Sequence, residues 1–526
     1  MKPIAPIFQA VTPAGAPGCV VGVQQGGQLL FRGAYGLASL ELAVPLSPHT
    51  RFRVASVTKQ FTVTAVLMLA AQGRLSLDDE IHAHLPELAP LPQAVTLEHL
   101  MRNTSGLPDF LETLRLGGVG LDADIGRAAM LRCIAGNRHL NFAPGSRFLY
   151  SNTNFLLLGL VVERIAGCSL GDFLQQYVFA PLGMRHTLLE VAPDTPLPGL
   201  ATPYVPDGSG GWRRARHGFE HGGEGGLVSC IDDLLLWTAA LGRDVPGPLP
   251  AGLLAQLSSP TRLTQGADSP YARGLEHSRL DGRRCVGHAG LWPGFRTELL
   301  HLPDEALSVV VISNSLASNP YLLARQVARA VLGVEAAVPA PSLDGLQGRW
   351  LCAEEPAQFD LAVRDGELWA TQWGAPFQLE PQADGCWLPL RGAFELRLGR
   401  LDGRTLQVDL GAGRWVRFER LAETVPLPDG LAGDYRCADI GADWHIDDDG
   451  ALWIRGPHAA GVRWQLRGLR PDLVEVLGHS GGMPNAQLAR LERDAAGHIV
   501  ALRLHTSRIR GLRFERATAA APARRG

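Results

Sequence analysis

Apolar and polar positions along residues 18–332 switch between strand-like and helix-like patterns. Residues 18–37 hold two β-rich runs separated by a Gly-Gly pair, which predicts a hairpin. Residues 56–72 form a largely apolar run that ends at Gly73, and residues 155–165 repeat apolar positions with helical spacing. Residues 285–313 return to short strands. Strands at both ends with helices between them predict an α+β domain, in which helices flank an antiparallel sheet.

The pattern changes after residues 333–341, which read as a linker. Short runs of alternating polarity follow, separated by Gly and Asp-Gly turns, with almost no helical period. Residues 348–354 resemble residues 433–439, and residues 365–369 resemble residues 449–453. The repeating unit is too long for one hairpin, so it predicts two related all-β units, either small sandwiches or closed barrels.

These patterns divide the chain into three domains and a tail. At 526 residues the chain is too long for a single core. We expect an α+β domain over residues 1–336 and two all-β domains over residues 337–426 and 427–517. Residues 518–526 are small, basic or proline, and we expect them to form a disordered tail.

Composition narrows the classes of partner and compartment. The chain is 46% apolar and 19% charged, as a soluble globular protein is, and its net charge of -3 gives no reason to expect nucleic acid. The eight cysteines are scattered without a Cys-x-x-Cys pair, which favours reduced thiols over a disulfide framework or a zinc site. The apolar runs are too short to span a bilayer and no secretory signal is recognisable. We therefore expect a cytoplasmic protein that does not bind membranes.

Two clusters of polar residues give weaker signals. Residues 221–226 read His-Gly-Gly-Glu-Gly-Gly, and no Lys-Ser/Thr follows as it would in a phosphate loop. These glycines predict a tight backbone passage beside a site. His82 and His84 lie beside acidic residues, but the spacing supplies no third ligand. We therefore expect neither a metal nor another cofactor.

One serine and one lysine stand out against the composition. The chain has 49 basic residues, yet only Lys2 and Lys59 are lysines. Ser56 and Lys59 are three residues apart, so on a helix they share a face and the amine can take or relay the serine proton. A guanidinium does not lose its proton in proteins, whereas a buried lysine can be neutral near pH 7. The pair predicts an activated nucleophile, and a surface lysine beside a helix-starting serine is the alternative.

Two later segments carry groups that suit acyl transfer. Tyr150 and Asn152 point to one side if their segment is extended. A phenol whose pKa is depressed by a nearby ammonium can carry a proton between Ser56 and a leaving group. His288 and Gly290 open a strand, where glycine lets a substrate backbone lie close to the sheet. Each residue alone also fits a structural role, as a core-edge tyrosine, a cap or a hydrogen-bonded histidine.

Together these motifs resemble a known family. Ser-x-x-Lys at 56–59, Tyr-x-Asn at 150–152 and His-x-Gly at 288–290, in place of Lys-Thr-Gly, are similar to the serine β-lactamase and penicillin-binding-protein superfamily. The surrounding sequences resemble its class C-like hydrolases, namely residues 55–62, 142–155, 226–237 and 287–296. The two appended β units narrow the resemblance to bacterial D-stereospecific aminopeptidases.

The resemblance implies a fold and a set of roles. It implies a β-lactamase-like domain followed by two antiparallel β-barrels, and a homodimer. The implied catalytic residues are Ser56 as nucleophile, Lys59 as its activator, Tyr150 as proton carrier, and His288 in the place of the family's strand lysine. Asn152 would contact the substrate amide. The backbone N–H groups of Ser56 and Leu291, beside Gly290, would form the oxyanion hole.

One departure from the family concerns the amine of the substrate. In the aminopeptidases a loop of the last domain looks into the active site, where an acid on it meets the free ammonium. The corresponding stretch here, residues 478–484, has no acid, and its Ser480 is expected to contact the substrate instead. An ammonium buried without a partner is costly, so Glu276 is predicted as the substitute. A solvated carboxylate at a strand end is the alternative for Glu276.

The sequence therefore predicts a serine hydrolase that acts through an acyl-enzyme. Its expected reaction is release of N-terminal D-amino acids from peptides, amides or esters, so its expected partner is a small peptide or amino-acid amide. A class C-like carboxylesterase or β-lactamase-like hydrolase with no free-amine requirement is the alternative enzyme. A non-catalytic binding protein of the same fold is a third interpretation, against which the intact Ser56, Lys59 and Tyr150 argue.

Overall fold

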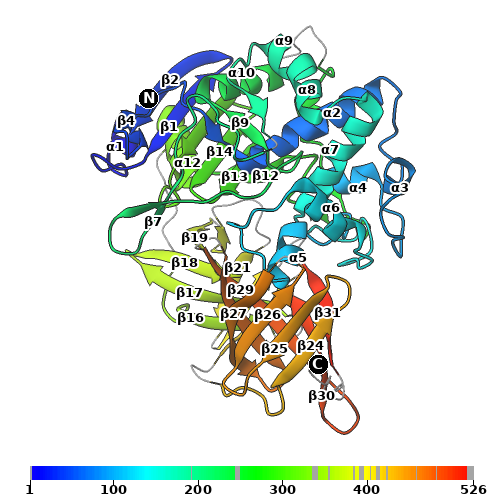
Figure 1. The fold of residues 1–526 in the computed structure, drawn as a ribbon. Helices are drawn as coiled ribbons and strands as arrows, with labels where there is room; N and C mark the ends of the chain where they lie inside the picture. The colour runs from blue at the N-terminus through cyan, green and yellow to red at the C-terminus, as the bar shows by residue number, and fades with distance from the viewer. Residues whose placement is uncertain are drawn as a thin grey trace.

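Three bodies of structure follow one another along the chain (Figure 1). An α+β domain comes first, and two closed antiparallel barrels follow it, so the predicted fold class is confirmed. The repeated β units are barrels rather than sandwiches. The computed structural model describes residues 3–190, 192–242, 249–334, 342–352, 356–382, 385–389, 396–402, 404–409, 415–421, 425–457, 459–480 and 483–517. The greater part of the predicted linker, at 335–341, and the predicted tail at 518–526 lie outside these described residues.

The first domain is built on one antiparallel sheet, six-stranded in the described residues. Its order is β12-β13-β14-β15-β1-β2, and its strands are β1 (Cys19–Gln25), β2 (Gln28–Tyr35), β12 (Glu276–Leu280), β13 (Arg283–Trp292), β14 (Phe295–Leu302) and β15 (Leu307–Ser313). The predicted hairpin at 18–37 is confirmed as β1 and β2. Strand β1 pairs with β15, from Cys19 opposite Ser313 to Gln25 opposite Leu307. The start and end of the domain are therefore joined through the sheet.

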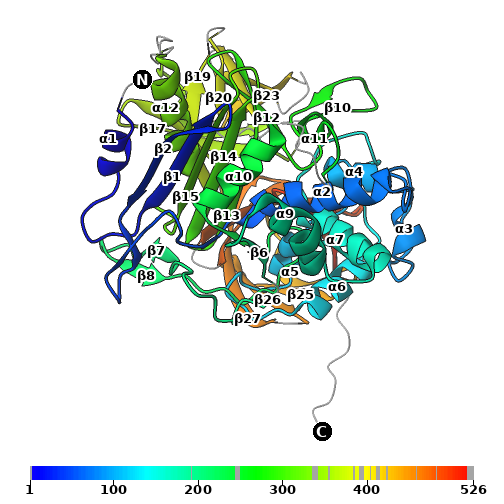
Figure 2. The ribbon, with the colours of Figure 1, turned by 90° about the horizontal axis from the view of Figure 1, so that it is seen from above.

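Helices cover both faces of this sheet (Figure 2). Successive strand residues point to opposite faces, so each face packs against its own set of helices. Val21 packs with Phe8 of α1 (Ala5–Gln9) and with α12 (Pro320–Leu332). Its neighbour Val20 belongs to the larger core on the other face, together with α10 (Ile231–Leu241). Strands buried on both faces hold the sheet rigid, which is the support that a catalytic site needs.

The helical part of the domain surrounds α2 (Thr58–Ala71). Every residue of α2 from Thr58 to Leu69 is buried, as expected for a helix enclosed on all sides. The predicted helix at 155–165 is confirmed as α7 (Asn152–Ala166), which contacts α2. Shorter helices complete this part, including α4 (Leu97–Met101), α5 (Phe110–Leu116), α6 (Arg127–Ala135) and α8 (Leu170–Leu174).

The two barrels repeat the same construction. The first comprises β16 (Gly348–Cys352), β17 (Gln358–Arg364), β18 (Glu367–Gln372), β19 (Ala375–Pro381), β20 (Trp387–Pro389), β21 (Arg397–Asp402), β22 (Thr405–Asp409) and β23 (Trp415–Arg420). The second comprises β24 (Gly433–Cys437), β25 (Ala442–Ile446), β26 (Ala451–Gly456), β27 (Ala459–Arg470), β28 (Leu473–Ser480), β29 (Met483–Arg493), β30 (Ile499–His505) and β31 (Arg510–Arg516). Trp350 and Tyr435, matched by the repeat, each donate a 2.8 Å hydrogen bond to the backbone carbonyl four residues earlier. A buried aromatic with a polar group needs such a partner.

The second barrel docks on α5 of the first domain (Figure 1). Leu116, the last residue of α5, is buried in the apolar cluster of the second barrel. Trp444 inside that barrel donates a 2.9 Å hydrogen bond from Nε1 to the Leu116 carbonyl. Apolar packing and a buried hydrogen bond therefore fix the barrel against the helix whose N-terminal end reaches the site described below.

Two expectations from composition concern membranes and metals. Within the described residues, no single helix is both long and apolar enough to cross a membrane, although the bent pair Asn152–Ala166 and Leu170–Leu182 passes on length and composition alone. The same residues contain no group of three or more His, Cys, Asp or Glu side chains that could hold a metal ion. His84 instead contacts Asp79 at 3.0 Å, and His82 lies 3.0 Å from the carbonyl of Ala89.

Candidate active site

Ser56 lies at a sharp bend of the chain that leads directly into α2. It is the middle residue of a short 3-10 turn, η1 (Ala55–Val57), and the helix continues from Thr58. Ala55 has φ of 49°, in the left-handed region that non-glycine residues rarely adopt. Strained backbone of this kind persists only where the surroundings enforce it, and it is common at functional sites.

Strand β13 runs close beside this bend. A Cβ atom at Gly290 would lie 2.1 Å from the Val54 carbonyl oxygen, so only glycine allows the approach. The close contact predicted for Gly290 is therefore made by the chain's own backbone. Leu291 follows in the wall of the same pocket, with its side chain 40% exposed. The oxyanion hole formed by the N–H groups of Ser56 and Leu291 stays a prediction.

Lys59 is fully buried and meets three oxygen atoms. Its Nζ lies 3.0 Å from Ser56 Oγ, 2.9 Å from Asn152 Oδ1 and 2.6 Å from the carbonyl oxygen of Glu224. Burial lowers the pKa of Lys59 to about 7, so a large fraction of the amine is neutral at that pH. A neutral amine has two N–H groups. If these bind Asn152 Oδ1 and the Glu224 carbonyl oxygen, two atoms that can only accept, the lone pair points at the Ser56 hydroxyl.

Tyr150 lines the pocket beside Ser56 and Lys59, and the Ser56 hydroxyl interacts with its phenol. Burial raises the pKa of the Tyr150 phenol above its ordinary value, and the positive charge of Arg508 offsets this only in part. The prediction of a depressed phenol pKa was therefore wrong, because desolvation outweighs the nearby charge. Tyr150 rests as a neutral phenol, which can pass a proton but does not serve as the resting base.

Asn152, the first residue of α7, is held at both ends of its side chain. Its Oδ1 accepts from Lys59, while its backbone N–H and Nδ2 donate to Asp109 Oδ2 at 2.7 and 2.9 Å. Asp109 caps the N-terminus of α5, where its Oδ1 accepts from the N–H groups of Leu111 and Glu112. Asn152 therefore fixes the orientation of Lys59. Its contact with a substrate amide stays a prediction.

His288 is a buried, neutral histidine. Its Nδ1 donates to the Ala289 carbonyl at 2.7 Å, so Nε2 is free to accept the Tyr271 hydroxyl at 2.9 Å. Burial, assisted by the nearby Lys59, lowers the pKa of His288 to about 3. The ring lies 6.1 Å from that of Tyr150, centroid to centroid. It lines the pocket as predicted, but without the charge that the family's lysine would bring, and its catalytic role stays a prediction.

The glycine-rich segment at 221–226 passes tightly behind the site, as predicted. A Cβ atom at Gly223 would lie 2.6 Å from the carbonyl oxygen of Phe155. The next residue, Glu224, supplies the carbonyl that Lys59 contacts, and its buried carboxylate accepts from Gly222 and His221. Burial alone would raise the pKa of Glu224, but these hydrogen bonds hold it below its ordinary value. Glu224 thus places a negative charge near Lys59.

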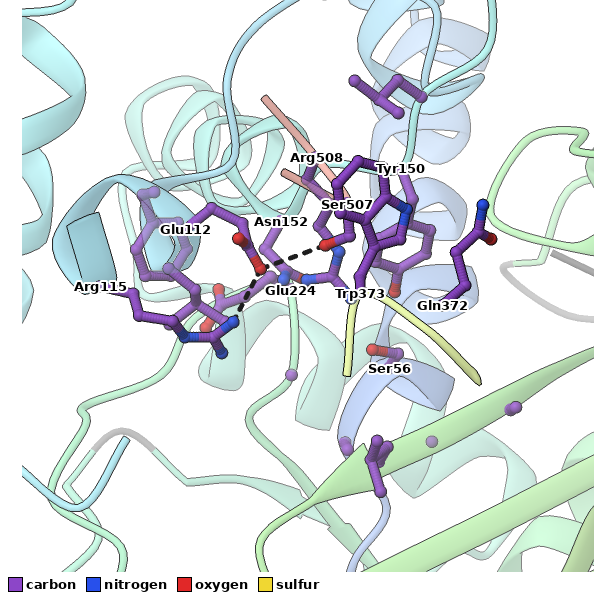
Figure 3. Close-up of a pocket in the computed structure, with 18 of the residues that line it drawn as sticks. Ser56, Glu112, Arg115, Tyr150, Asn152, Glu224, Gln372, Trp373, Ser507 and Arg508 are labelled. Atoms are coloured by element: carbon purple, nitrogen blue, oxygen red, sulfur yellow. Dashed lines mark hydrogen bonds and ion pairs between the residues drawn. The ribbon is translucent and has the colours of Figure 1, made fainter. Parts of the chain in front are cut away.

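All three domains line the pocket over Ser56, which has a volume of about 1360 Å³ (Figure 3). The barrels contribute two turns that we call the barrel turns, residues 372–374 between β18 and β19 and residues 506–509 between β30 and β31. Pro484, the last residue of the stretch 478–484, lies in the wall together with Asn485. The side chain of Ser480 and residues 481–482 lie outside what the structure describes.

Arg508, in the second barrel turn, is a site residue that no sequence pattern singled out. Its Nη1 lies 3.3 Å from Asp109 Oδ2, and its guanidinium carbon is 4.8 Å from the centroid of the Tyr150 ring. The last domain therefore reaches the site with an arginine. Its charge is opposite to that of the acid expected from the resemblance.

Glu276 lies in the pocket wall, but on a different face of the sheet from His288. It begins β12 directly opposite Gly287 of β13, and paired residues point to the same side. His288 is the next residue of β13, so its side chain points the other way. Leu280, two pleats along from Glu276, accordingly packs in the α12 cluster. The amine-binding role of Glu276 stays a prediction.

Glu112 is another acid in the pocket wall, and sequence reasoning missed it. It lies on the first turn of α5, and its Oε1 accepts from Arg115 at 2.9 Å and from Ser507 at 3.2 Å (Figure 3). Its backbone N–H is bound by Asp109, the residue that holds Asn152. The Asp-x-x-Glu pattern at 109–112 was a readable sign of a helix start, but it carried no sign of the pocket.

Comparison with known proteins adds to this geometry. The family model described as Beta-lactamase matches residues 7–333. A D-aminopeptidase of Gluconobacter oxydans (strain 621H) is 33% identical over 319 residues, which cover 60% of this chain and 59% of that protein, less than two thirds of its length. A D-aminopeptidase of Brucella ovis (strain ATCC 25840 / 63/290 / NCTC 10512) is 28% identical over 517 residues, covering 95% of this chain and 96% of that protein.

Solved structures show the same fold for the first domain. The penicillin binding protein from Bacillus halodurans has a TM-score of 0.54 and 27% identity, covering 63% of this chain and 100% of that chain. The D-amino acid amidase from Ochrobactrum anthropi SV3, complexed with D-phenylalanine, has a TM-score of 0.52 and 22% identity. That match covers 63% of this chain and 98% of the amidase.

Proposed function

The chain belongs to the β-lactamase family, and we propose that it is a serine hydrolase that removes N-terminal D-amino acids from small peptides, amides or esters. The observation that carries the proposal is the buried Lys59, whose Nζ lies 3.0 Å from Ser56 Oγ and whose pKa burial lowers to about 7. The similarity to D-aminopeptidases, which extends through both barrels in the Brucella ovis protein, supports the substrate class.

The proposed reaction proceeds through an acyl-enzyme. Neutral Lys59 takes the Ser56 proton while Oγ forms a bond to the substrate carbonyl carbon, and the N–H groups of Ser56 and Leu291 stabilise the oxyanion. The carbon–nitrogen bond then breaks, and the leaving amine receives the proton from Lys59 through the Tyr150 hydroxyl. Water then attacks the resulting ester and the bond between the carbonyl carbon and Ser56 Oγ breaks. One proton of the water passes through Tyr150 and Lys59 to Oγ, which frees the D-amino acid and restores Ser56.

Glu112 is the better proposed partner for the substrate ammonium. Both of its hydrogen bonds are made to Oε1, so Oε2 is the oxygen that would meet a bound ammonium. It lies on the first turn of α5, whose capping residue Asp109 holds Asn152, whereas Glu276 projects from the opposite face of β12. A charge-assisted hydrogen bond of this kind contributes strongly to recognition.

Hydrolysis of D-alanine p-nitroanilide and of its N-acetylated form tests this assignment. The wild type should prefer the free amine, and Glu112→Gln should reduce that preference about 10- to 100-fold, the value of one charged hydrogen bond. Glu276→Gln is the matched control and should keep the preference. If Glu276→Gln loses it instead, the sequence prediction was right and Glu112 is not the partner.

A hydrolase without a free-amine requirement is the second candidate. The observation that favours it is Arg508, which brings a positive charge to the Tyr150 ring where the resemblance called for an acid. Equal rates on free and blocked amines by the wild type would support this carboxylesterase-like or β-lactamase-like activity and contradict the aminopeptidase proposal.

A further inference from the structure

The turn at 506–509 is fixed to the first domain on several sides. Thr506 Oγ1 accepts from the backbone N–H groups of Arg508 and Ile509, which closes the turn. Asn141 of the first domain donates to the Arg508 carbonyl at 3.2 Å and accepts from the N–H of Arg510 at 2.7 Å. These bonds hold the backbone on both sides of the Arg508 side chain, so the barrel presents that side chain in a defined place.

We propose that Arg508 is a positioning residue for the reaction, which acts on Lys59 through Asp109 and Asn152. The inference rests on the proposed hydrolysis by Ser56. One continuous set of contacts carries it: Arg508 to Asp109 Oδ2, Asp109 Oδ2 to Asn152, Asn152 Oδ1 to Lys59, and Lys59 to Ser56. The second barrel would thereby form part of the catalytic apparatus.

Asp109 needs a cation to play its part in this set. Its side chain is fully buried, and a buried carboxylate without a positive partner is strongly disfavoured. Both donors of Asn152 end on Oδ2, the oxygen that Arg508 also contacts. The positive charge of Arg508 offsets the cost of burying this carboxylate, and Arg508 thereby helps to hold Oδ2 where Asn152 binds it.

The charge of Arg508 also acts on the titration of Lys59. Burial is the largest cause of the lowered pKa of Lys59, Arg508 lowers it further, and the surrounding acids raise it, namely Glu224, Asp109 and Glu276. Tyr150, just before α7, and His288 of β13 also lie near Lys59. Both stay uncharged near neutrality. Removing the arginine would withdraw one positive charge and expose the charge of Asp109, and both changes raise the pKa of Lys59.

The test measures how fast Ser56 of the full-length protein is labelled by a fluorophosphonate at a series of pH values. The pH of half-maximal rate in Arg508→Met should rise by about one unit, and labelling at pH 7 should slow roughly tenfold. Arg508→Lys, which keeps the charge, should keep the wild-type profile. In Asp109→Asn, adding Arg508→Met should slow labelling less than about threefold more, because the two residues act in series.

Two further variants separate charge from folding. Ser507→Ala removes a contact of the same turn without changing charge, and its half-maximal pH should match the wild type. Arg508→Gln is a second neutral variant that retains a hydrogen-bond donor for Asp109, and it should show the upward shift while circular dichroism confirms that it is folded. An unshifted profile in a folded neutral variant would overturn the inference. A wild type that is not labelled at any pH would overturn the proposed function itself.

Discussion

The first domain and the barrel turns build the same pocket with side chains of different burial. The first domain supplies Lys59 and Asp109. Both side chains are wholly buried, and hydrogen bonds to Asn152 of the same domain fix their orientation. The barrel turns supply half-buried side chains, and that of Arg508 is 32% exposed. Groups that must change protonation lie where water is excluded, whereas groups that position or select can remain partly solvated. The difference indicates that the first domain performs the chemistry and the barrels adjust it.

The two barrel turns also differ in what supports them. The turn at 506–509 is held by the first domain through Asn141. The turn at 372–374 is held by the second barrel. A Cβ atom at Gly374 would lie 2.7 Å from the carbonyl oxygen of Pro484, and the guanidinium carbon of Arg510 lies 5.7 Å from the centroid of the Trp373 ring. Influence on the site should therefore fall from the first domain to the second barrel and then to the first barrel.

Lys59→Arg should give the largest loss of activity, because it removes the buried amine that takes the proton of Ser56. Arginine keeps its proton in proteins, so it cannot take the proton of Ser56. We expect kcat/KM on D-alanine p-nitroanilide to fall about 1000-fold or more, with circular dichroism unchanged. Lys2→Arg, at the other lysine of the sequence, is the matched control. Substantial turnover by Lys59→Arg would refute the role given to the buried amine.

The pH dependence of kcat/KM should report the same buried group. Below pH 7 Lys59 is protonated and has no lone pair, so the rate should fall about tenfold per pH unit. Above pH 7 Lys59 is neutral and the rate should level off, until the α-ammonium of the substrate loses its proton at about pH 8 and its ion pair with the pocket is lost. The pKa of His288, about 3, lies too low to add a step between pH 5 and 9. A profile that is flat down to pH 5 would place the general base elsewhere.

Trp373→Ala should have the smallest effect on catalysis, since its turn is held by the second barrel and not by the first domain. Trp373 lines the pocket and holds a φ of 53°, yet nothing in the proposed reaction passes through it. We expect KM to rise roughly fivefold, the value of one aromatic contact, with kcat nearly unchanged. Trp415→Ala, at a 43% exposed tryptophan of the same barrel, should leave both constants unchanged. A kcat loss as large as that of Arg508→Met would contradict the ordering.

The parts of the site that the sequence could predict are those made by neighbours along the chain. Ser56 and Lys59 are one helical turn apart, so their contact follows from spacing, and Tyr150 and Asn152 lie in one short motif. The β repeats predicted two domains because each unit carries its own turns and aromatic positions. The class of the first domain followed likewise from its order of strands and helices.

The remaining parts of the site depend on how the three domains pack against one another. Arg508 and Asp109 are 399 residues apart and meet because a barrel turn rests on α5. The face of the sheet on which Glu276 lies depends on strand register. A shift of one residue along a strand moves its side chains to the other face, and the sequence alone does not set the register so finely. The raised pKa of Tyr150 reflects burial by segments from several domains, which no local pattern reveals.

The central claim, acylation of Ser56 by a D-aminoacyl substrate, is tested most directly by trapping the intermediate. The protein is mixed with D-alanine p-nitrophenyl ester, quenched in acid, digested and analysed by mass spectrometry. We expect one alanyl group on the peptide that contains Ser56, little labelling by the L-enantiomer, and none in Lys59→Arg. An alanyl group on another residue, or equal labelling by both enantiomers, would contradict this claim.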